Sequence, residues 1–505
     1  MPKLTDFLMA NPGAQKCDAV RSDISFDSVS TDSRTVGPGQ LFFALSGPTF
    51  DGHAFVQSAL DQGAVAAVIS RDIGPVNGTV VMVPDTLQAL QAWATYWRAQ
   101  WPGRLAAVTG SNGKTTVKQM VAKIFAMACG ETGAWATPGN LNNHIGVPLS
   151  VLGLQPSHQL AVLELGMNHP GEIAALAAIA QPHVALVNNA QREHQEFMKT
   201  VEAAAQENGQ VLAALPAEGI AIFPRDPQHE SIWAGLAAGR KMIRFGLVNM
   251  PAADAFSGQE ILGEWQQLQA DQAQTEESKA GGFHAVGSQA EESHAERQAQ
   301  PQRMLSVTFP GQSAVSIELK GVGDHFALNA LAAASVAYAC GCPVPVIQQA
   351  LTQFQPVRGR GAQRALAGGG WLIDDTYNAN PDSVRAAIDA LAGLTPPRAL
   401  VLGDMGEVGD QGSAFHQEVL RHAQDQRIES LWLFGSAFHL AQQQTGIGRH
   451  FADIHSLVTG LTAWIDSQQQ QSRWPSIWIK GSRFMQMERV VNSLNTQPIG
   501  EPRCC

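Results

Sequence analysis

The residues best suited to chemistry lie in the run TGSNGKTT at positions 109–116. An apolar strand-like segment ends there, glycines allow the backbone amides to point inward, and a helix-like segment follows with its partial positive charge. A lysine in such a loop can reach the β- and γ-phosphates of a nucleotide, and the hydroxyl after it can hold Mg²⁺. We therefore expect nucleotide binding through Thr109, Gly110, Ser111, Asn112, Gly113, Lys114, Thr115 and Thr116.

The spacing of this loop differs from the common phosphate-loop pattern, which places four residues between its first glycine and GK[ST]. Here Gly110 lies only three positions before Gly113. The alternative is a tight strand-to-helix turn with an incidental lysine. The run GKTT directly after an apolar strand favours nucleotide binding over that alternative.

Other polar residues follow strands of the same predicted sheet. Glu164 ends the segment AVLELG, at the edge where α/β sheets bind ligands, although a solvated strand-end carboxylate would look the same. His194, in NNAQREHQEF, follows the next strand, and its spacing suits a structural histidine as well as a ligand. The asparagines of TPGNLNNHIGVP, Asn143 among them, suit either a turn or a binding loop.

A doubly wound α/β unit would position these residues. Apolar runs without alternation, separated by helical patterns, are typical of a buried parallel sheet. We expect strands at 104–110, 159–166 and 183–189, with helices at about 115–127 and 172–180.

Two further α/β units flank this one, so we expect three domains at 1–101, 102–355 and 356–505. The break WPG ends the first domain, and the third contains four more strand-like runs: WLIDDTYN, RALVLGD, SLWLFG and SIWIKGS. Residues 257–303 are rich in glutamine and poor in apolar side chains. Such a segment cannot bury enough surface to offset its ordering entropy, so we expect a disordered surface insertion there.

Composition narrows the class of protein. The chain has 505 residues, of which 45% are hydrophobic and 15% charged, as in globular proteins of about three domains. A net charge of −11 argues against nucleic acid as a partner. We find no apolar stretch suited to membrane insertion, no signal-peptide core at the start and no CxxC spacing among the cysteines. We expect a cytoplasmic protein with reduced thiols.

Several motifs in order resemble the Mur ligase family, ATP-dependent enzymes that build the peptide stem of peptidoglycan. The motifs are STDSR (30–34), TGSNGKTT, GNLNNHIGVP, ELGMNHPGEI, GDHFALNALAA (323–333), DDTYNANPDS (374–383) and GDMGEVGDQGSAFHQEV (403–419). The short-spaced phosphate loop is the form that this family uses. The likeness runs from about residue 25 to Arg483, apart from the glutamine-rich segment.

The resemblance implies an N-terminal domain for a UDP-sugar, a central ATPase-like domain and a C-terminal Rossmann-like domain. It implies that a substrate carboxylate attacks the γ-phosphate of ATP, and that an amine then displaces phosphate from the acyl phosphate. The motifs are most similar to those of members that join D-alanyl-D-alanine to UDP-N-acetylmuramoyl-tripeptide, with ATP and Mg²⁺ as cofactors. We expect a monomer. Attack on a polyanion requires charge neutralisation, and a labile acyl phosphate requires exclusion of water.

The resemblance also implies residue roles, with Lys114, Glu164 and His194 as the catalytic set. Lys114 would hold the phosphates, Thr115 and Glu164 one Mg²⁺, and His194 a second. The other implied positions are Asn329 at the adenine, Arg360 near the phosphates, Asp375 near the ribose, Ser33 and Arg34 at the uridine diphosphate, Asn143 facing the substrate, and Tyr377, Asn378 and Asn380 at the dipeptide. Without the motif, Asp375 would be a strand end, and Asn378 and Asn380 turn residues.

One segment departs from the family. Many members carry a lysine, modified to a carbamate, where this chain has Asn208 in AQENGQ. A neutral amide cannot supply that negative charge, so either Glu207 or water replaces it near the second Mg²⁺, or that site is weaker. The run AQREHQEF also differs from the AHLExF form of the family.

Other functions are less consistent with the sequence. A sister ligase that adds a diamino acid should carry a DNPR-like motif in its C-terminal domain, and this chain has none there. A folylpolyglutamate-type enzyme is not expected to carry STDSR. A phosphate-loop NTPase or kinase is disfavoured by the loop spacing and by the three α/β units, and a non-catalytic nucleotide-binding module would need neither GKTT nor Glu164.

Overall fold

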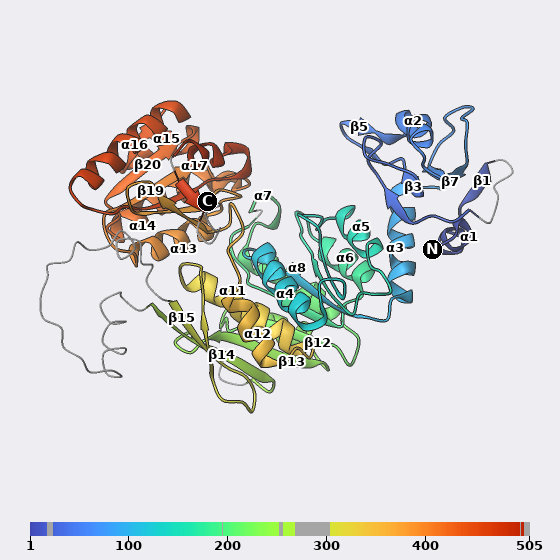
Figure 1. Ribbon diagram of the computed structural model, residues 1–505, viewed down its shortest axis with the longest axis horizontal. Coiled ribbons are helices and arrows are strands. Elements are labelled where there is room, and N and C mark those ends of the chain that lie inside the picture. Colours follow the sequence, from blue (N-terminus) through green and yellow to red (C-terminus); the bar gives the residue numbers. More distant parts are fainter. Residues whose placement is uncertain (18–23, 194, 252–255, 268–302, 495, 499–505) are drawn as a thin grey trace, which may run out of the picture.

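The computed structural model describes residues 1–17, 24–193, 195–251, 256–267, 303–494 and 496–498. These residues form three α/β units, each with its own sheet (Figure 1). In Figure 1 the N-terminal unit lies at the upper right, the C-terminal unit at the upper left, and the central unit below them. The prediction of a three-domain α/β chain is confirmed.

The central sheet has nine strands, and neighbouring strands are parallel except at one edge, where β15 pairs antiparallel with both β14 and β16. Its strands at the site are buried because helices cover both faces, which explains their apolar sequences without alternation. The strand order is β16 (Val315–Glu318), β15 (Arg303–Thr308), β14 (Gln259–Gln267), β13 (Lys241–Leu247), β12 (Ile220–Pro224), β11 (Val184–Val187), β8 (Arg104–Thr109), β10 (Leu160–Glu164) and β9 (Ala134–Ala136).

Two helix layers enclose this sheet, each with its own hydrophobic core. One layer holds α4 (Lys114–Cys129), α11 (Asp324–Ala339) and α12 (Val344–Thr352). The other holds α5 (Gly146–Leu152), α6 (Glu172–Ala180), α8 (Val201–Ala213) and α9 (Glu230–Leu236). The short α7 (Gln195–Met198) adjoins the C-terminal unit at η3 (Gly409–Gln411).

The bounds expected for the insertion, 257–303, are wrong at both ends. Gln259–Gln267 forms β14, and Arg303 begins β15, which pairs with β14. β14 contains Glu260, Glu264 and Gln266, so its composition looks like that of a solvated segment although its backbone is in the sheet. Residues 268–302 lie outside the described residues.

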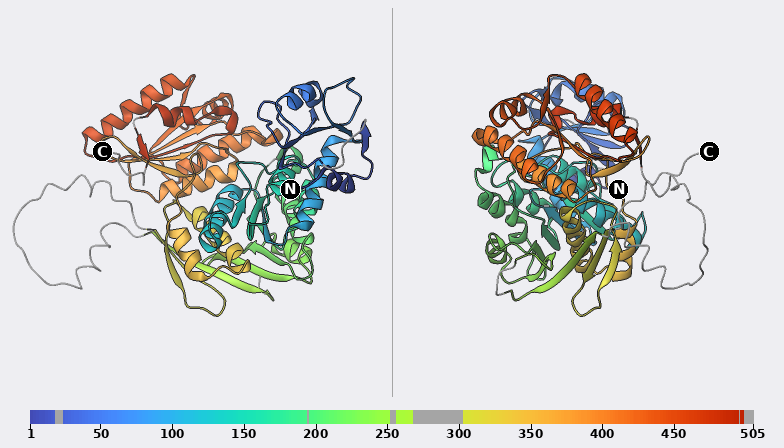
Figure 2. Two further views of the ribbon diagram at one scale, coloured as in Figure 1. Left: turned by 45° about the vertical axis from the view of Figure 1, so that its right-hand side comes forward. Right: turned by 90° about the vertical axis from the view of Figure 1, so that its left-hand side faces the viewer.

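The N-terminal sheet has five strands in the order β1 (Gln15–Cys17), β7 (Val80–Met82), β6 (Ala66–Ile69), β3 (Gln40–Phe43) and β2 (Ser28–Ser30). Its other elements are α1 (Leu4–Ala10), the hairpin β4 (Ser46–Gly47) and β5 (Phe50–Asp51), η1 (Gly52–Phe55), α2 (Val56–Asp61) and α3 (Thr86–Gln100). Helix α3 packs against α5 and α6, and this packing attaches the unit to the central domain. Figure 2 shows the three units from two further sides.

The C-terminal sheet has seven strands in the order β21 (Arg449–Phe451), β20 (Ser430–Phe434), β19 (Arg398–Gly403), β22 (Ser476–Lys480), β18 (Trp371–Asp375), β17 (Ala362–Leu366) and β23 (Thr496–Pro498). Helices α13 (Pro381–Ala392), α14 (Gly412–Asp425) and α15 (Ser436–Thr445) cover one face. The other face is covered by α16 (Ile454–Gln470) and α17 (Glu488–Ser493), with η4 (Arg483–Met485) before α17. The neighbouring strands β18, β22, β19, β20 and β21 are all parallel, in a Rossmann-like arrangement.

Within the described ranges, every helix is too short or too polar to cross a bilayer.

Candidate active site

The phosphate loop joins the end of β8 to the start of α4. Gly110 and Gly113 have φ of +130° and +81°, a backbone conformation that favours glycine. A Cβ at Gly113 would lie 2.2 Å from Asn329 Oδ1 and 2.7 Å from Asn188 Nδ2. Glycine is therefore required at position 113 by both its conformation and its neighbours.

Lys114 is folded back onto its own loop. Its Nζ donates to the carbonyl oxygens of Gly110 and Ser111, the latter at 3.1 Å. It also lies 3.3 Å from Oε2 of Glu193, a carboxylate that the sequence analysis did not identify. The ammonium group is thus held at the mouth of the loop by two carbonyl oxygens and one carboxylate.

Thr115 and Glu164 lie together, as expected for a Mg²⁺ site. Thr115 Oγ1 donates to Glu164 Oε1 over 3.1 Å, and Asn142 Nδ2 donates to the same oxygen over 2.8 Å. Among the described residues, Oε2 of Glu164 is one of the few buried side-chain oxygens without a hydrogen-bond partner. An orphaned carboxylate oxygen beside a hydroxyl fits a hard cation with oxygen ligands.

The segment after β11 clamps the loop from the other side. Asn188 Nδ2 donates to the carbonyl of Asn112 (2.7 Å) and to Asn329 Oδ1 (2.9 Å). Asn189 Oδ1 accepts from the backbone N–H of Asn112 over 2.8 Å. His194, the expected ligand of a second Mg²⁺, lies outside the described residues.

A cavity of about 540 Å³ opens between the phosphate loop and the C-terminal domain. It brings together nine of the residues that the sequence analysis singled out: Asn112, Gly113, Thr116, Asn329, Arg360, Asp375, Tyr377, Asn378 and Asn380. His325 lines the same cavity, and burial lowers the pKa of its imidazole, so the ring stays neutral near pH 7. The volume suits a small-molecule ligand.

The C-terminal residues in this cavity are held by hydrogen bonds and stacking. Asp375 accepts from Lys480 Nζ over 2.8 Å. The guanidinium of Arg360 lies 3.8 Å from the centre of the Tyr377 ring.

The asparagines of this motif have structural roles as well. Asn380 Oδ1 caps α13 by accepting from the backbone N–H of Ser383, and Asn380 Nδ2 donates to Asn112 Oδ1 over 2.9 Å. Asn378 Oδ1 accepts from the N–H of Ala379 over 2.9 Å. The turn interpretation and the binding interpretation therefore apply to the same residues.

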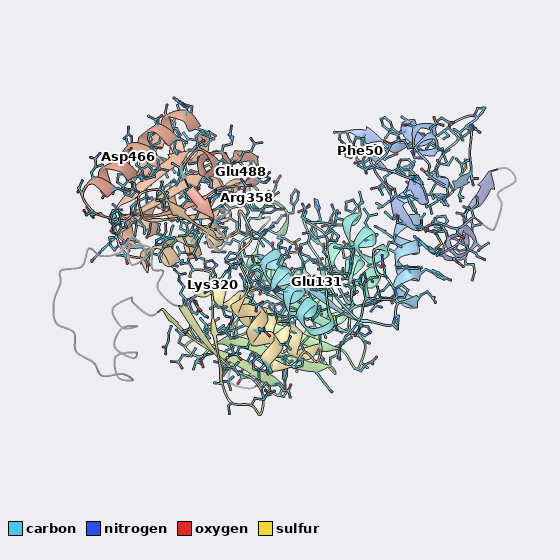
Figure 3. The ribbon with its side chains drawn as sticks, in the orientation of Figure 1. Phe50, Glu131, Lys320, Arg358, Asp466 and Glu488 are labelled. Carbon is cyan, nitrogen blue, oxygen red and sulfur yellow. The ribbon has the colours of Figure 1, made fainter. Side chains whose placement is uncertain are left out.

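Three expected substrate residues do not line this cavity. Ser33 and Arg34 lie in the N-terminal domain, where the Arg34 side chain is 85% exposed and pairs with Asp32, lowering the pKa of that carboxyl to about 2. Asn143 Oδ1 accepts from the N–H of Gly146 at the start of α5. Figure 3 shows the separation of the domains: Phe50 in the N-terminal domain lies apart from Arg358, which precedes the cavity residue Gly359.

Glu207 and Asn208, which lie where the sequence departs from the family pattern, have different surroundings. Asn208 Oδ1 accepts from Thr109 Oγ1 (2.6 Å) and from the N–H of Gly110 (2.9 Å), so its side chain contacts the phosphate loop. The Glu207 carboxylate is directed at the start of α6, where it accepts from the backbone N–H groups of Gly171 and Ile173. Glu207 therefore does not replace a charge at position 208.

An ion-pair network holds the C-terminal domain against the loop. Arg192 donates from its backbone N–H and its guanidinium to Asp382 on α13, and through Nη1 to Glu418 on α14 over 2.7 Å. Arg385 also donates to Glu418. The hydrogen bonds of Arg192 hold the pKa of Glu418 below its usual value.

Comparisons with known proteins agree with this architecture. Three family descriptions match: "Mur ligase family, catalytic domain" over 25–97, "Mur ligase middle domain" over 108–337, and "Mur ligase, glutamate ligase domain" over 359–471. The UDP-N-acetylmuramoyl-tripeptide–D-alanyl-D-alanine ligase of Escherichia coli K12 is 35% identical over 473 residues, covering 94% of each chain. The enzyme of the same name from Bacillus subtilis 168 is 30% identical over 478 residues and 93% of each chain.

Solved structures give the same result. A crystal structure of MurF from Acinetobacter baumannii superposes with a TM-score of 0.82 at 29% identity, covering 97% of each chain. MurF ligase from Thermotoga maritima in complex with ADP shares the fold, with a TM-score of 0.74 at 22% identity over 94% of this chain and 98% of its own. With this fold, these family matches and relatives at 30% and 35% identity over nearly the whole chain, the protein belongs to the Mur ligase family.

Proposed function

We infer that this protein is an ATP-dependent ligase that joins D-alanyl-D-alanine to UDP-N-acetylmuramoyl-tripeptide in the synthesis of peptidoglycan precursors. The observation that carries the inference is the cavity between the phosphate loop and the DDTYNANPDS motif, in a chain 35% identical to an enzyme of that name. An ATP-dependent ligase needs its nucleotide next to both the carboxylate that it activates and the amine that attacks the product of that activation. This cavity is lined by the central and C-terminal domains, so it could bring these groups together.

The central domain would hold the nucleotide. The inward backbone amides of residues 110–113 and the N-terminus of α4 favour a polyphosphate, and Lys114 would move from its loop carbonyls to the phosphates. Mg²⁺, held by Thr115 and Glu164, would offset negative charge on the phosphates when the substrate carboxylate approaches. Asn329 would lie at the adenine, Asp375 near the ribose and Arg360 near the phosphates.

The other substrates would reach the site from the flanking domains. Ser33 and Arg34 would bind the uridine diphosphate, and Asn143 would face the tripeptide end. Tyr377, Asn378 and Asn380 would receive the dipeptide, whose amine attacks the acyl phosphate. Because that intermediate hydrolyses readily, the C-terminal domain would close over it and exclude water. We further propose that the enzyme is cytoplasmic, since its nucleotide-linked substrate and ATP are both cytoplasmic, and that it acts as a monomer.

The test is phosphate release by the purified protein with ATP, Mg²⁺ and UDP-N-acetylmuramoyl-tripeptide, with and without D-alanyl-D-alanine. We expect release to depend on the dipeptide and the product to be heavier by one dipeptide, less water, by mass spectrometry. Diaminopimelate and lysine forms of the tripeptide, assayed side by side, would define the third stem residue. Phosphate release that ignores both peptides would contradict the proposed function.

A further inference from the structure

Glu193 is a buried carboxylate at the phosphate loop. Its side chain is only 6% exposed and follows β11 by a few residues. Oε2 lies 3.3 Å from Lys114 Nζ, and Oε1 accepts from Asn208 Nδ2 over 3.2 Å. A charge removed from water needs a counter-charge, and in this state Lys114 supplies it.

Asn208 fixes the position of this carboxylate. Its Oδ1 accepts two hydrogen bonds from the phosphate loop, and its Nδ2 donates to Glu193 and to the carbonyl of Ala204 (3.0 Å). All four hydrogen-bonding positions of the amide are used, and the residue is 1% exposed. Glu193 is therefore tied to the loop through a rigid side chain, and cannot turn away without breaking this network.

Nucleotide binding would remove the counter-charge. If Lys114 moves to the phosphates, Glu193 remains buried beside a polyanion, and two sets of negative charge then face each other across a site of low dielectric. A divalent cation on the phosphates would relieve this repulsion. Nucleotide without a cation would have to compete with Glu193 for the ammonium of Lys114.

We propose that Glu193 is a positioning residue that holds Lys114 in the nucleotide-free enzyme and makes nucleotide binding depend on a divalent cation. The proposal rests on nucleotide binding at the phosphate loop, which is part of the proposed function. In this chain Glu193, an unmodified glutamate, would supply the negative charge at this edge of the site, because position 208 holds a neutral amide.

The test is calorimetric titration with ADP, in Mg²⁺ and separately in EDTA. Glu193→Gln keeps the shape and can still accept from Asn208, but removes the charge. We expect this variant to bind ADP in EDTA roughly ten-fold more tightly than the wild type does, and to change less in Mg²⁺. The affinity ratio, defined as the ADP affinity in Mg²⁺ divided by that in EDTA, should therefore fall. Glu193→Asp keeps the charge and should retain most of the cation dependence.

The matched control is Glu207→Gln. Glu207 is also a buried carboxylate and neighbours Asn208, but it bonds to the start of α6. Its substitution should leave the affinity ratio unchanged, and thermal melts would verify that each variant is folded. If Glu193→Gln is unfolded, Glu193→Ala replaces it in the same titration.

Two results would be distinguishable failures. An unchanged ratio in charge-removing variants at position 193, with ADP binding intact, would overturn the role of Glu193 and leave the proposed ligase unaffected. A wild-type protein that binds ADP in neither condition would overturn the proposed function, and this inference with it.

Discussion

At the scale of single residues, the site is organised by carboxylates whose partners differ. Oε1 of Glu164 receives hydrogen bonds from Thr115 and Asn142, while its buried Oε2 has no hydrogen-bond partner among the described residues. A buried carboxylate oxygen without a partner is unfavourable unless a ligand completes it. Glu164 is therefore poised to accept a cation.

Substituting Glu164 should weaken the response to Mg²⁺. Glu164→Gln removes the charge but keeps an oxygen for Thr115 and Asn142, so we expect the Mg²⁺ concentration for half-maximal phosphate release to rise about 10- to 100-fold. A Mg²⁺ titration of the activity measures this. Glu172→Gln, at a half-buried carboxylate that caps its own loop at Asn168 and His169, should respond to Mg²⁺ as the wild type does.

At the scale of elements, the two ends of α4 separate backbone strain from function. Gly113 precedes the helix and Gly130 follows it, and both have φ of +81°. A Cβ at Gly113 would collide with Asn329 and Asn188, whereas a Cβ at Gly130 would meet nothing within 4 Å. Their ψ angles differ, at −7° for Gly113 and 158° for Gly130, and the second conformation is open essentially to glycine alone. Backbone strain is therefore at least as large at Gly130, where no steric effect on the site accompanies it.

Alanine substitutions at these glycines should therefore differ in binding. We expect the backbone strain to lower the free energy of unfolding by about 1 kcal/mol in Gly113→Ala and by up to about 3 kcal/mol in Gly130→Ala. Only Gly113→Ala should also lose ADP binding, by at least about ten-fold, because Asn188 and Asn329 must move. Chemical denaturation and calorimetry measure the two effects. Equal ADP affinities in the two variants would contradict the steric role of Gly113.

The hairpin of β14 and β15 makes the 268–302 segment testable. Gln267 and Arg303 are direct partners across the hairpin, so their backbones are already adjacent. We expect replacement of residues 268–302 by an Asn-Gly turn to leave kcat and the thermal midpoint near the wild-type values. Loss of activity with unchanged circular dichroism would show that the segment has a role in the reaction.

At the scale of the whole molecule, Arg192 connects the phosphate loop to the C-terminal domain. It lies between Gln191, which donates to Ser111 Oγ, and Glu193. Its guanidinium donates to Asp382 and Glu418, and its position 5.0 Å from the centre of the Phe415 ring adds a cation–π contact. Movement of the C-terminal domain would therefore have to break charge-assisted hydrogen bonds at the loop.

Removing this arginine should affect the dipeptide more than the nucleotide. We expect Arg192→Ala to lower kcat/KM for D-alanyl-D-alanine about ten-fold, because the C-terminal domain docks less often, with ADP affinity nearly unchanged. Arg385→Ala removes an arginine that also pairs with Glu418 but does not join the domains, and should change kcat/KM little. Equal effects of the two substitutions would exclude a specific coupling through Arg192.

The same network predicts a pH dependence. Arg192 holds the pKa of Glu418 below its ordinary value of 4.5 in the docked state. The contribution of the Arg192–Glu418 ion pair to docking is therefore full above pH 4.5 and is lost as the pH falls through the lowered pKa of Glu418. Small-angle scattering should show the docked arrangement at pH 5 and expansion on further acidification. In Glu418→Gln that contribution is absent at every pH, so expansion should begin from a less compact state.

Much of the site could be predicted because its residues are close in sequence. The loop at 109–116 contains its glycines, its lysine and the start of its helix in one run, so local conformational rules suffice to identify it. Glu164 was identifiable because it ends an apolar strand. Helix α6 has the predicted bounds, because the run EIAALAAIA begins just after Pro170 and Gly171 and is rich in alanine and leucine, which favour helix. The half-exposed strand β14 was missed because its polar residues resemble those of a solvated loop.

The fold class, the family and the position of the phosphate loop could be read from the sequence alone, since these depend on short patterns and on their order. Which carboxylate faces Lys114, which amide holds that carboxylate and which domain contacts Arg192 became known only from the three-dimensional structure. Thr109 and Asn208 are 99 positions apart, and Arg192 and Glu418 are 226 apart. Contacts at such separations have no local signal, because they depend on how the sheets and helices pack rather than on the conformational preferences of the residues themselves.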